Sequence, residues 1–362
     1  MKPELNALAT TLQGGEPLCA SELHLALEDC RLRVRSNSAE LLAALRGYFS
    51  HVVAAPARPD IDTIAIERAA PEPGVEFIDW QREPGKTGRK DSYADIPGGR
   101  LIRKVRTGMV FLQSAGPRIA AGPCRQYDNQ LINFINSQYM TWLQHRGWLI
   151  CHAAGLVYRG RCLGIAGFSG GGKSTLMLQL LDQKDVAYLT NDRLFIHAGD
   201  GAPLARGIPK LPRVNPGTIV HNPRLQPLIP AAQREHLLGL RSGELWKLEQ
   251  KYDVDIARLY GPGRIVSEAP LGGFLILNWR RDSNAATAIT PVDLATRPDL
   301  LAAVMKSPGP FYQHPDGTFQ QDIAAFDHQA WLDVLQGVAV HEVTGRTDFN
   351  ALAGRSLEDL LA

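Results

Sequence analysis

One run of residues has the types and spacing that suit phosphate binding. Gly167–Ser174, with the sequence GFSGGGKS, matches the pattern Gly-x4-Gly-Lys-Ser/Thr. An apolar segment at 162–166 precedes the run, and a segment with helical spacing at 175–181 follows it. A phosphate-binding loop of this pattern joins a strand to a helix. Both flanks therefore favour such a loop over a glycine-rich turn without a ligand.

The chemistry expected of this run follows from its residue types. Glycines adopt backbone conformations that turn successive amide N–H groups toward an anion, and the following helix adds the positive end of its dipole. The Lys173 ammonium is expected to reach the β- and γ-phosphates of ATP, and the Ser174 hydroxyl to ligate Mg²⁺. The predicted nucleotide contacts are Gly167, Phe168, Ser169, Gly170, Gly171, Gly172, Lys173, Ser174 and Thr175.

A carboxylate that holds the metal is usually found at the end of a nearby apolar strand. Val186–Asp192 follows the loop's helix after a short turn and ends in Asp192. The alternative is a turn aspartate, since Asn-Asp is a common turn pair. The loop just upstream favours a metal-binding or catalytic role for Asp192.

A histidine lies in the apolar segment Trp148–Tyr158, where a lone histidine is usually a satisfied core residue. Arg159-Gly160 can form a hairpin turn that pairs this segment with 162–167. Antiparallel pairing matches residues at equal distances from the turn, which places His152 opposite Gly167. The sequence therefore predicts that His152 lies beside the phosphates and takes part in catalysis.

Together these segments resemble the catalytic domain of the HPr kinase/phosphorylase family, in which a histidine-containing strand turns into the loop and a later strand ends in an acidic pair. The matching segments are 151–155, 167–174 and 191–193. The resemblance covers 148–200 well and the rest of the second domain weakly. With its different N-terminal region, the chain is most similar to the HprK-related kinases of type B.

This resemblance implies an α/β fold: a P-loop nucleotide-binding domain of HPr-kinase-like type with a smaller N-terminal α/β domain. It implies an ATP- and Mg²⁺-dependent kinase that phosphorylates a hydroxyl, a serine of a protein or a small molecule. The family's acidic pair is Asp-Asp, and its first member is the base toward the acceptor. Asn191 stands there in this chain, so the base is Asp192 or His152, or the reaction differs. An ATP-binding switch module, or an ATPase without kinase activity, is the alternative.

The family's later Glu-x-Arg-Gly-x-Gly signature is not visible in this chain. The sequence therefore supports neither HPr as the acceptor nor the phosphorylase activity. Lys210 and Arg213, on the proline-rich loop 207–217, are candidate cations for the transferred phosphoryl group. A solvated surface loop is the equal alternative. Glu249, Asp253 and Asp255 offer a second metal ligand, although a charged helix end is favoured. The basic run at 100–106 predicts a solvated face.

Composition bounds the class of protein. Hydrophobic residues make up 44% and charged residues 21%, which excludes wholesale disorder. The net charge of +2 gives no argument for nucleic acid or an anionic membrane as a partner. No apolar run reaches the about 18 residues that cross a bilayer. Five scattered cysteines without a Cys-x-x-Cys pair and no signal-peptide core predict a cytoplasmic protein.

The chain's 362 residues predict about two domains. Cys30, Leu32 and Val34 alternate with arginines, typical of a half-buried strand whose arginines form a solvated or phosphate-binding face. A helix at 127–145 is expected to lead into the second domain. We place the boundary near residue 125. Residues 1–125 are expected to recognise the acceptor or to mediate assembly, for example into a homo-oligomer. Residues 126–362 are expected to form the catalytic domain.

Overall fold

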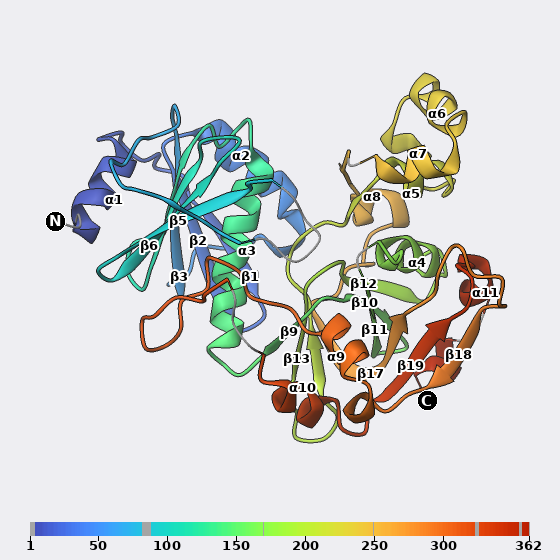
Figure 1. Ribbon diagram of the computed structural model, residues 1–362. Coiled ribbons are helices and arrows are strands. Elements are labelled where there is room, and N and C mark those ends of the chain that lie inside the picture. The colour runs from blue at the N-terminus through green and yellow to red at the C-terminus, as the bar shows by residue number, and fades with distance from the viewer. Residues whose placement is uncertain are drawn as a thin grey trace. The chain divides into compact units, whose positions relative to one another are not determined.

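The computed structural model describes residues 4–81, 88–168, 170–248, 250–322, 326–354 and 357–361. The chain divides into two compact units (Figure 1). Unit 1 comprises Met1–Gly147 with Ser307–Phe326, and unit 2 comprises Trp148–Lys306 with Asp327–Ala362. Each unit contains a large sheet and helices, so the fold is of mixed α/β class.

Unit 1 contains an eight-stranded sheet in the order β1-β2-β3-β8-β7-β6-β5-β4. Strands β2, β3 and β8 are parallel, and the other pairs are antiparallel. Its elements are α1 (Leu5–Gln13), β1 (Leu23–Leu27), β2 (Cys30–Ser36), α2 (Ala39–Tyr48), η1 (Ser50–Val52), β3 (Ile61–Glu67), β4 (Ile78–Asp79), β5 (Asp91–Ile96), β6 (Gly99–Lys104), β7 (Val110–Ser114), β8 (Ile119–Gly122) and α3 (Asp128–Gln144).

The predicted boundary near residue 125 differs from this division, because α3 packs within unit 1. The ring of Phe134 on α3 lies 5.0 Å from that of Phe111 on β7, between their centroids. Phe311, from the returning segment, packs on both rings at 5.5 Å and 5.4 Å. Apolar burial therefore ties both the helix and residues 307–326 to the first sheet.

The arginines of β2 form a paired structural face. Cys30, Leu32 and Val34 are buried, and the intervening residues are half-buried, as the alternation predicts. The Arg33 Nε donates to Asp62 Oδ1 at 3.0 Å, and Arg35 contacts the same carboxylate. Because Asp62 contacts both arginines and Glu22 contacts Arg33 as well, the structure favours the solvated-face interpretation of this strand over a phosphate-binding one.

The prediction of a solvated basic face at 100–106 is wrong for Arg100. Its side chain has no exposed surface. The guanidinium donates to the Gln320 carbonyl at 2.8 Å and to Asp95 Oδ2 at 2.9 Å. It also lies over the rings of Tyr93 and Phe319, 4.4 Å and 4.7 Å from their centroids. Arg100 thus anchors the returning segment to β5 and β6 by hydrogen bonds and cation–π contacts.

Arg100→Ala is expected to lower the free energy of unfolding by about 3 kcal/mol, because it leaves a cavity and a buried carbonyl without its donor. Urea unfolding measures this change. Arg103→Ala is the matched control: its guanidinium contacts Glu72, whose side chain is 81% exposed, so we expect a loss of at most about 0.5 kcal/mol. Equal losses in the two variants would contradict the anchoring role of Arg100.

Unit 2 contains a nine-stranded sheet and the glycine-rich run. Its elements are β9 (Leu149–Cys151), β10 (Ala154–Tyr158), β11 (Arg161–Gly167), α4 (Lys173–Leu180), β12 (Val186–Thr190), β13 (Leu194–His197), β14 (Leu204–Arg206), β15 (Arg213–Val214), α5 (Pro216–Val220), η2 (Gln226–Leu228), α6 (Ala231–Leu238), α7 (Ser242–Lys247), β16 (Tyr252–Asp253), α8 (Ile256–Tyr260), β17 (Glu268–Leu277), β18 (Ala288–Pro291), η3 (Leu294–Thr296), α9 (Pro298–Val304), α10 (His328–Leu335), β19 (Ala339–Thr344), α11 (Phe349–Ala353) and α12 (Leu357–Leu360).

The long strand β17 connects the two halves of this sheet. Its first residues pair with β14, which leads to β13 and β9. Its last residues are parallel to β11 and β19. On the other side of β11 lie β10 and then β12, each antiparallel to its neighbour. Consequently β11, β12, β17 and β19 run in one direction, and their carboxyl ends meet at one edge.

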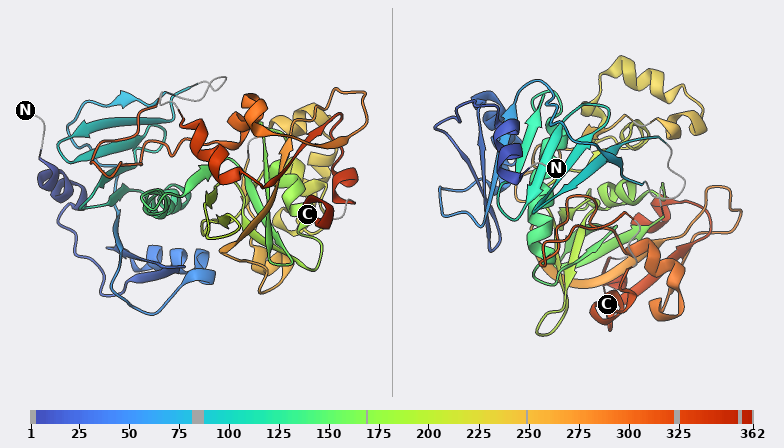
Figure 2. Two further views of the ribbon diagram at one scale, coloured as in Figure 1. Left: turned by 90° about the horizontal axis from the view of Figure 1, so that it is seen from below. Right: turned by 60° about the vertical axis from the view of Figure 1, so that its left-hand side comes forward.

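Helices cover both faces of these strands (Figure 1 and Figure 2). Leu163 and Ile165 of β11 belong to a core that includes the apolar residues of α4. The opposite face, with Phe274 and Ile276 of β17, packs against apolar residues of α9 and Trp331 of α10. The alternation of β11 and β17 thus places α4 and α9 on opposite faces. None of the helices in the described ranges is both long and apolar enough to span a membrane.

Candidate functional site

The glycine-rich loop joins β11 to α4, in the strand–loop–helix order that its flanks predicted. Gly170 and Gly172 have φ of 78° and 86°, which residues with a side chain rarely adopt. A Cβ on Gly172 would also lie 2.6 Å from the ring of Phe349. Both positions therefore require glycine. The predicted contact Ser169 lies outside the described residues.

The first glycine of the loop is held against the neighbouring strand. Gly167 pairs with Leu277 of β17 and has a φ of 147°. A Cβ there would lie 2.7 Å from the Leu277 carbonyl oxygen. The Gly171 N–H donates to the Phe168 carbonyl at 3.0 Å, which closes the first turn of the loop. The path of the loop is therefore set by close backbone contacts that side chains would prevent.

Lys173, Ser174 and Thr175 form the first turn of α4, where the backbone N–H groups have no helical partner. The Lys173 ammonium donates to the Gly167 carbonyl at 2.8 Å, and the residue is 9% exposed. This contact holds the ammonium against the loop. The Thr175 hydroxyl instead forms a hydrogen bond of 2.8 Å with that of Thr218, so it fixes α4 to α5.

Asp192 follows β12, whose carboxyl end lies at the same edge of the sheet as the loop. The neighbour of β12 is β10 rather than β11. The amino end of β10 therefore lies between the loop strand and the aspartate, and His152 lies two residues before that end. The sheet thus brings His152 and Asp192 together at the edge where the loop begins.

The predicted continuous strand over 148–158 is broken at His152. The hairpin has the predicted register, with Ala154 opposite Ile165, but the pairing ends there, and His152 does not pair with Gly167. The His152 N–H donates instead to the Val304 carbonyl at 2.7 Å. His152 thus lies where the chain passes from β9, which pairs with β13 in one half of the sheet, into β10 in the other half.

The side chains of His152 and Asp192 form a pair, with His152 Nε2 3.2 Å from Asp192 Oδ1. Burial, opposed by the bond to Asp192 and assisted by the charge of Lys306, lowers the pKa of His152. Burial disfavours the charged carboxylate, but Arg193, the bond from His152 and Lys306 outweigh it and hold the pKa of Asp192 well below its ordinary value. A neutral imidazole therefore lies beside an ionised carboxylate at neutral pH.

Two cations of this cluster were missed from the sequence. Arg193 Nη1 contacts Asp192 Oδ2, and its position directly after the aspartate was the available signal. Lys306 is brought to the site by pairing across the fold, since its N–H donates to the Ile150 carbonyl at 3.2 Å. The sequence around Lys306, which follows α9, gives no local signal that this lysine lies near Asp192.

Asn191 occupies the place of the first acidic residue in the family pattern. Its Oδ1 is buried, and within the described part of the chain it accepts no hydrogen bond. A buried acceptor without a donor costs free energy of folding, and in natural proteins it often marks a functional site. Asn191 therefore offers a hydrogen-bond acceptor beside the His152–Asp192 pair.

The two predicted cations of loop 207–217 differ in their surroundings. Burial and the charge of Arg193, opposed by Asp192, lower the pKa of Lys210 to about 8. Lys210 thus belongs to the charge cluster around Asp192. Arg213 Nε lies 3.0 Å from Asp253 Oδ1, in a contact between β15 and β16. Its guanidinium is therefore engaged with a carboxylate, although its charge also contributes to the lowered pKa of Lys210.

Lys210→Met is expected to raise the melting temperature below pH 8, because it removes a charge that the folded protein holds at a cost. Below pH 8 Lys210 is charged in both the folded and the unfolded state, and the folded protein bears the full cost of that charge. Between the folded pKa of about 8 and the ordinary value of 10.5, the folded protein releases the proton first and this cost declines. The gain over wild type should decrease as pH rises through this window and vanish above it. Melting curves of both proteins from pH 6 to pH 11 test this. A gain independent of pH would contradict it.

Two of the three remaining acidic candidates have structural partners. Asp255 caps α8 by accepting from the Arg258 N–H at 3.0 Å, which agrees with the charged helix end favoured above. Asp253 contacts Arg213, and Glu249 lies outside the described residues. Among the residues that the structure describes, no three His, Cys, Asp or Glu side chains are grouped to hold a metal ion.

The donors that remain for a metal are the Ser174 hydroxyl and the Asp192 carboxylate. Both are hard oxygen ligands, the kind that Mg²⁺ prefers, and Mg²⁺ commonly uses one or two protein ligands with water and phosphate oxygens. His152 and Arg193 contact one carboxylate oxygen each, and each oxygen retains a second lone pair. The donor set therefore fits Mg²⁺ bound together with a nucleotide.

Comparison with known proteins adds little to this geometry. No family model matches the chain, and no curated protein matches it. Among solved structures, one similar to it is that of the Hpr(Ser) kinase/phosphatase from Coxiella burnetii. The match covers 58% of this chain and 84% of that chain at 12% sequence identity, with a TM-score of 0.26. At these values the likeness is weak and assigns no function, so we derive the function from the site alone.

Proposed function

We propose that the protein is an ATP- and Mg²⁺-dependent kinase that transfers the γ-phosphoryl group of ATP to a hydroxyl, a serine of a protein or a small-molecule alcohol. The observation that carries this proposal is the His152–Asp192 pair at the sheet edge where the glycine-rich loop begins. The γ-phosphate of a triphosphate bound to the loop amides would extend along this edge. The pair would then lie where an acceptor meets the γ-phosphate.

Each part of the site has a role in this reaction. The loop amides and the amino end of α4 bind the phosphates, and Lys173 moves from the Gly167 carbonyl to the β- and γ-phosphates. Ser174 and Asp192 would hold Mg²⁺, which neutralises charge on the phosphates. Lys210 adds positive charge near the transferred group.

His152 is the better base of the two candidates. General bases work best when their pKa lies near the working pH. The pKa of Asp192 lies far below it, whereas His152 is a neutral imidazole held by its Nε2 contact with Asp192. With Nε2 as the donor in that contact, Nδ1 carries the lone pair that accepts the proton of the reacting hydroxyl. Asp192 then orients the ring and stabilises the imidazolium that forms, and Asn191 Oδ1 accepts a hydrogen bond from a different N–H or O–H group of the acceptor.

Transfer of ³²P from γ-labelled ATP tests this proposal. Purified protein is incubated with labelled ATP, Mg²⁺ and an extract of the source cell, and labelled products are separated by size. A labelled product that appears with wild type and disappears with His152→Gln supports the kinase. Release of inorganic phosphate alone would contradict it.

A second candidate is an ATP-binding switch module or an ATPase without kinase activity. The observation that favours it is Asn191, an amide where the resembled family has its base. Tight binding of ATP without label transfer to any acceptor would support it. Asn191→Asp separates the two candidates further, because it restores a carboxylate at this position. Label transfer gained only in this variant would assign the switch function to the natural chain.

A further inference from the structure

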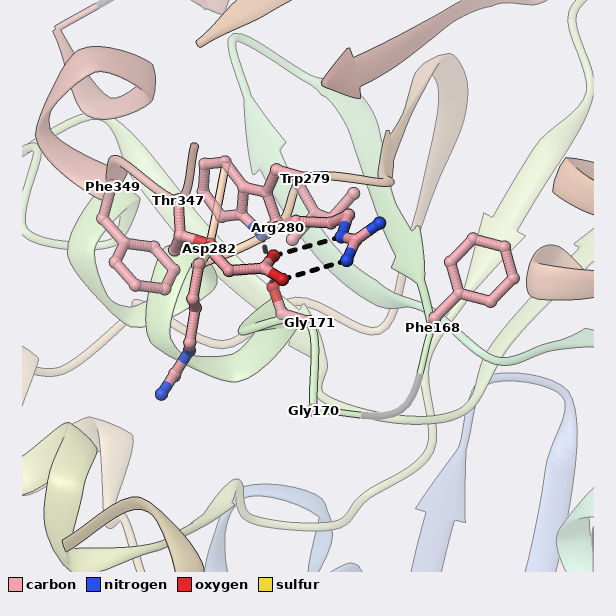
Figure 3. Close-up of a pocket in the computed structure, with 10 residues that line it drawn as sticks. Phe168, Gly170, Gly171, Trp279, Arg280, Asp282, Thr347 and Phe349 are labelled. Carbon is pink, nitrogen blue, oxygen red and sulfur yellow. Dashed lines mark hydrogen bonds and ion pairs between the residues drawn. The ribbon is translucent and has the colours of Figure 1, made fainter. Parts of the chain in front are cut away.

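A cavity of about 310 Å³ opens beside the glycine-rich loop, within unit 2 (Figure 3). Its walls come from the loop and from the segments that follow β17 and β19, two strands that run parallel to β11. Side chains that line it are Phe168, Trp279, Arg280, Asp282, Thr347 and Phe349. It lies at the same sheet edge as Asp192 but on the opposite side of β11.

Aromatic rings of this cavity are fixed to the loop. The Trp279 indole N–H donates to the Gly171 carbonyl at 2.8 Å. The rings of Trp279 and Phe349 pack edge to face, with 5.0 Å between their centroids. Phe349 also lies against Gly172. Two aromatic side chains are therefore positioned by the backbone that would hold the phosphates.

A third ring completes the apolar lining. Phe168, the second residue of the loop, is 43% exposed, which is high for a phenylalanine. In Figure 3, Phe168 lies on one side of the Arg280–Asp282 ion pair, and Trp279 and Phe349 lie on the other. The ion pair is bidentate, with Nε–Oδ1 3.1 Å and Nη2–Oδ2 2.9 Å. The cavity thus presents apolar faces together with polar groups, which are the Arg280–Asp282 pair, Arg281 and Thr347.

We propose that this cavity binds the purine base and ribose of the nucleotide, an inference that rests on the proposed function. A triphosphate on the loop has its nucleoside at one end and its γ-phosphate at the other. His152 and Asp192 lie on the β12 side of β11, where the γ-phosphate reacts. The nucleoside therefore extends to the β17 side, where the carboxyl ends of parallel strands form a crevice.

The chemistry of the lining selects a purine nucleoside. Aromatic side chains stack on the faces of bases, and a purine offers a larger face than a pyrimidine. The Arg280 guanidinium supplies donors and the Asp282 carboxylate supplies acceptors for the edge of the base or the ribose hydroxyls. The cavity volume lies at the lower end of the range for small-molecule sites, which suits one nucleoside.

Calorimetry with ATP, CTP and inorganic tripolyphosphate, each with Mg²⁺, tests the proposal. We expect wild type to bind ATP at least about fivefold more tightly than tripolyphosphate, because stacking contributes to ATP alone. ATP should also bind more tightly than CTP. Phe168→Ala should reduce the preference for ATP over tripolyphosphate. Phe326→Ala, which truncates another exposed phenylalanine outside the cavity, should leave both constants unchanged.

Tryptophan fluorescence gives a second readout. ATP should change the emission of wild type more than tripolyphosphate does, because only ATP places a base against Trp279, and this difference should be lost in Trp279→Phe. Binding of tripolyphosphate that depends on Lys173 but equals the binding of ATP would overturn the base subsite and leave the proposed function standing. Failure of both ligands to bind would overturn both proposals.

Discussion

Lys173→Ala is expected to weaken the binding of Mg²⁺·ATP by about 10- to 100-fold, since it removes charge-assisted hydrogen bonds to the phosphates. In this structure the ammonium is buried and bonded to the Gly167 carbonyl, 2.8 Å away. It is therefore already held at the loop, and phosphate oxygens replace one carbonyl acceptor. Titration calorimetry of wild type and variant measures the change.

Lys184→Ala is the matched control for this experiment. Lys184 lies between α4 and β12, is exposed, and has the same side chain. Its removal changes the net charge equally but leaves the loop intact. We expect no more than a twofold change in ATP affinity, since an exposed charge in water contributes little. If both variants bind ATP as wild type does, the loop does not bind the nucleotide.

Asp192→Asn is expected to lower the rate of phosphoryl transfer by about 10²- to 10⁴-fold, the range by which positioned acid–base groups accelerate reactions. The amide can still contact His152 but carries no charge to stabilise an imidazolium or to hold Mg²⁺. Binding of ATP measured without Mg²⁺ should change little, because the loop amides and Lys173 remain. Transfer of labelled phosphate measures the rate.

Asp185→Asn provides the control for Asp192. It makes the same chemical change next to the amino end of β12, at an exposed position. We expect its transfer rate to match wild type. A normal transfer rate in Asp192→Asn would mean that the contacts of Asp192 with His152 and Arg193 stabilise the structure only and take no part in the reaction.

The sequence predicted those parts of the site that depend on local chemistry. The loop's glycines are tied to backbone conformations at Gly170 and Gly172 that other residues rarely adopt. The strand before the loop and the helix after it follow from apolar spacing, and the hairpin register follows from the turn at Arg159-Gly160. These features require only residues close in the chain.

Features set by contacts between distant segments were not predicted. The break at His152 depends on Val304, and the charge that Lys306 adds to the site depends on its bond to Ile150. Arg100 lies in a run that has the composition of a solvated face, yet it is buried and in contact with Phe319 and Gln320 of the returning segment. Because local pattern cannot show which remote segment returns to a sheet, the extent of unit 1 was also missed.

The central claim is that the loop holds a triphosphate whose γ-phosphate faces His152 and Asp192. A crystal structure with Mg²⁺ and a non-hydrolysable ATP analogue tests it most directly. We predict the phosphates on the loop amides with Lys173 in contact, Mg²⁺ on Ser174 and Asp192, and His152 beside the γ-phosphate. An analogue bound elsewhere, or bound with its γ-phosphate directed away from this pair, would contradict the account.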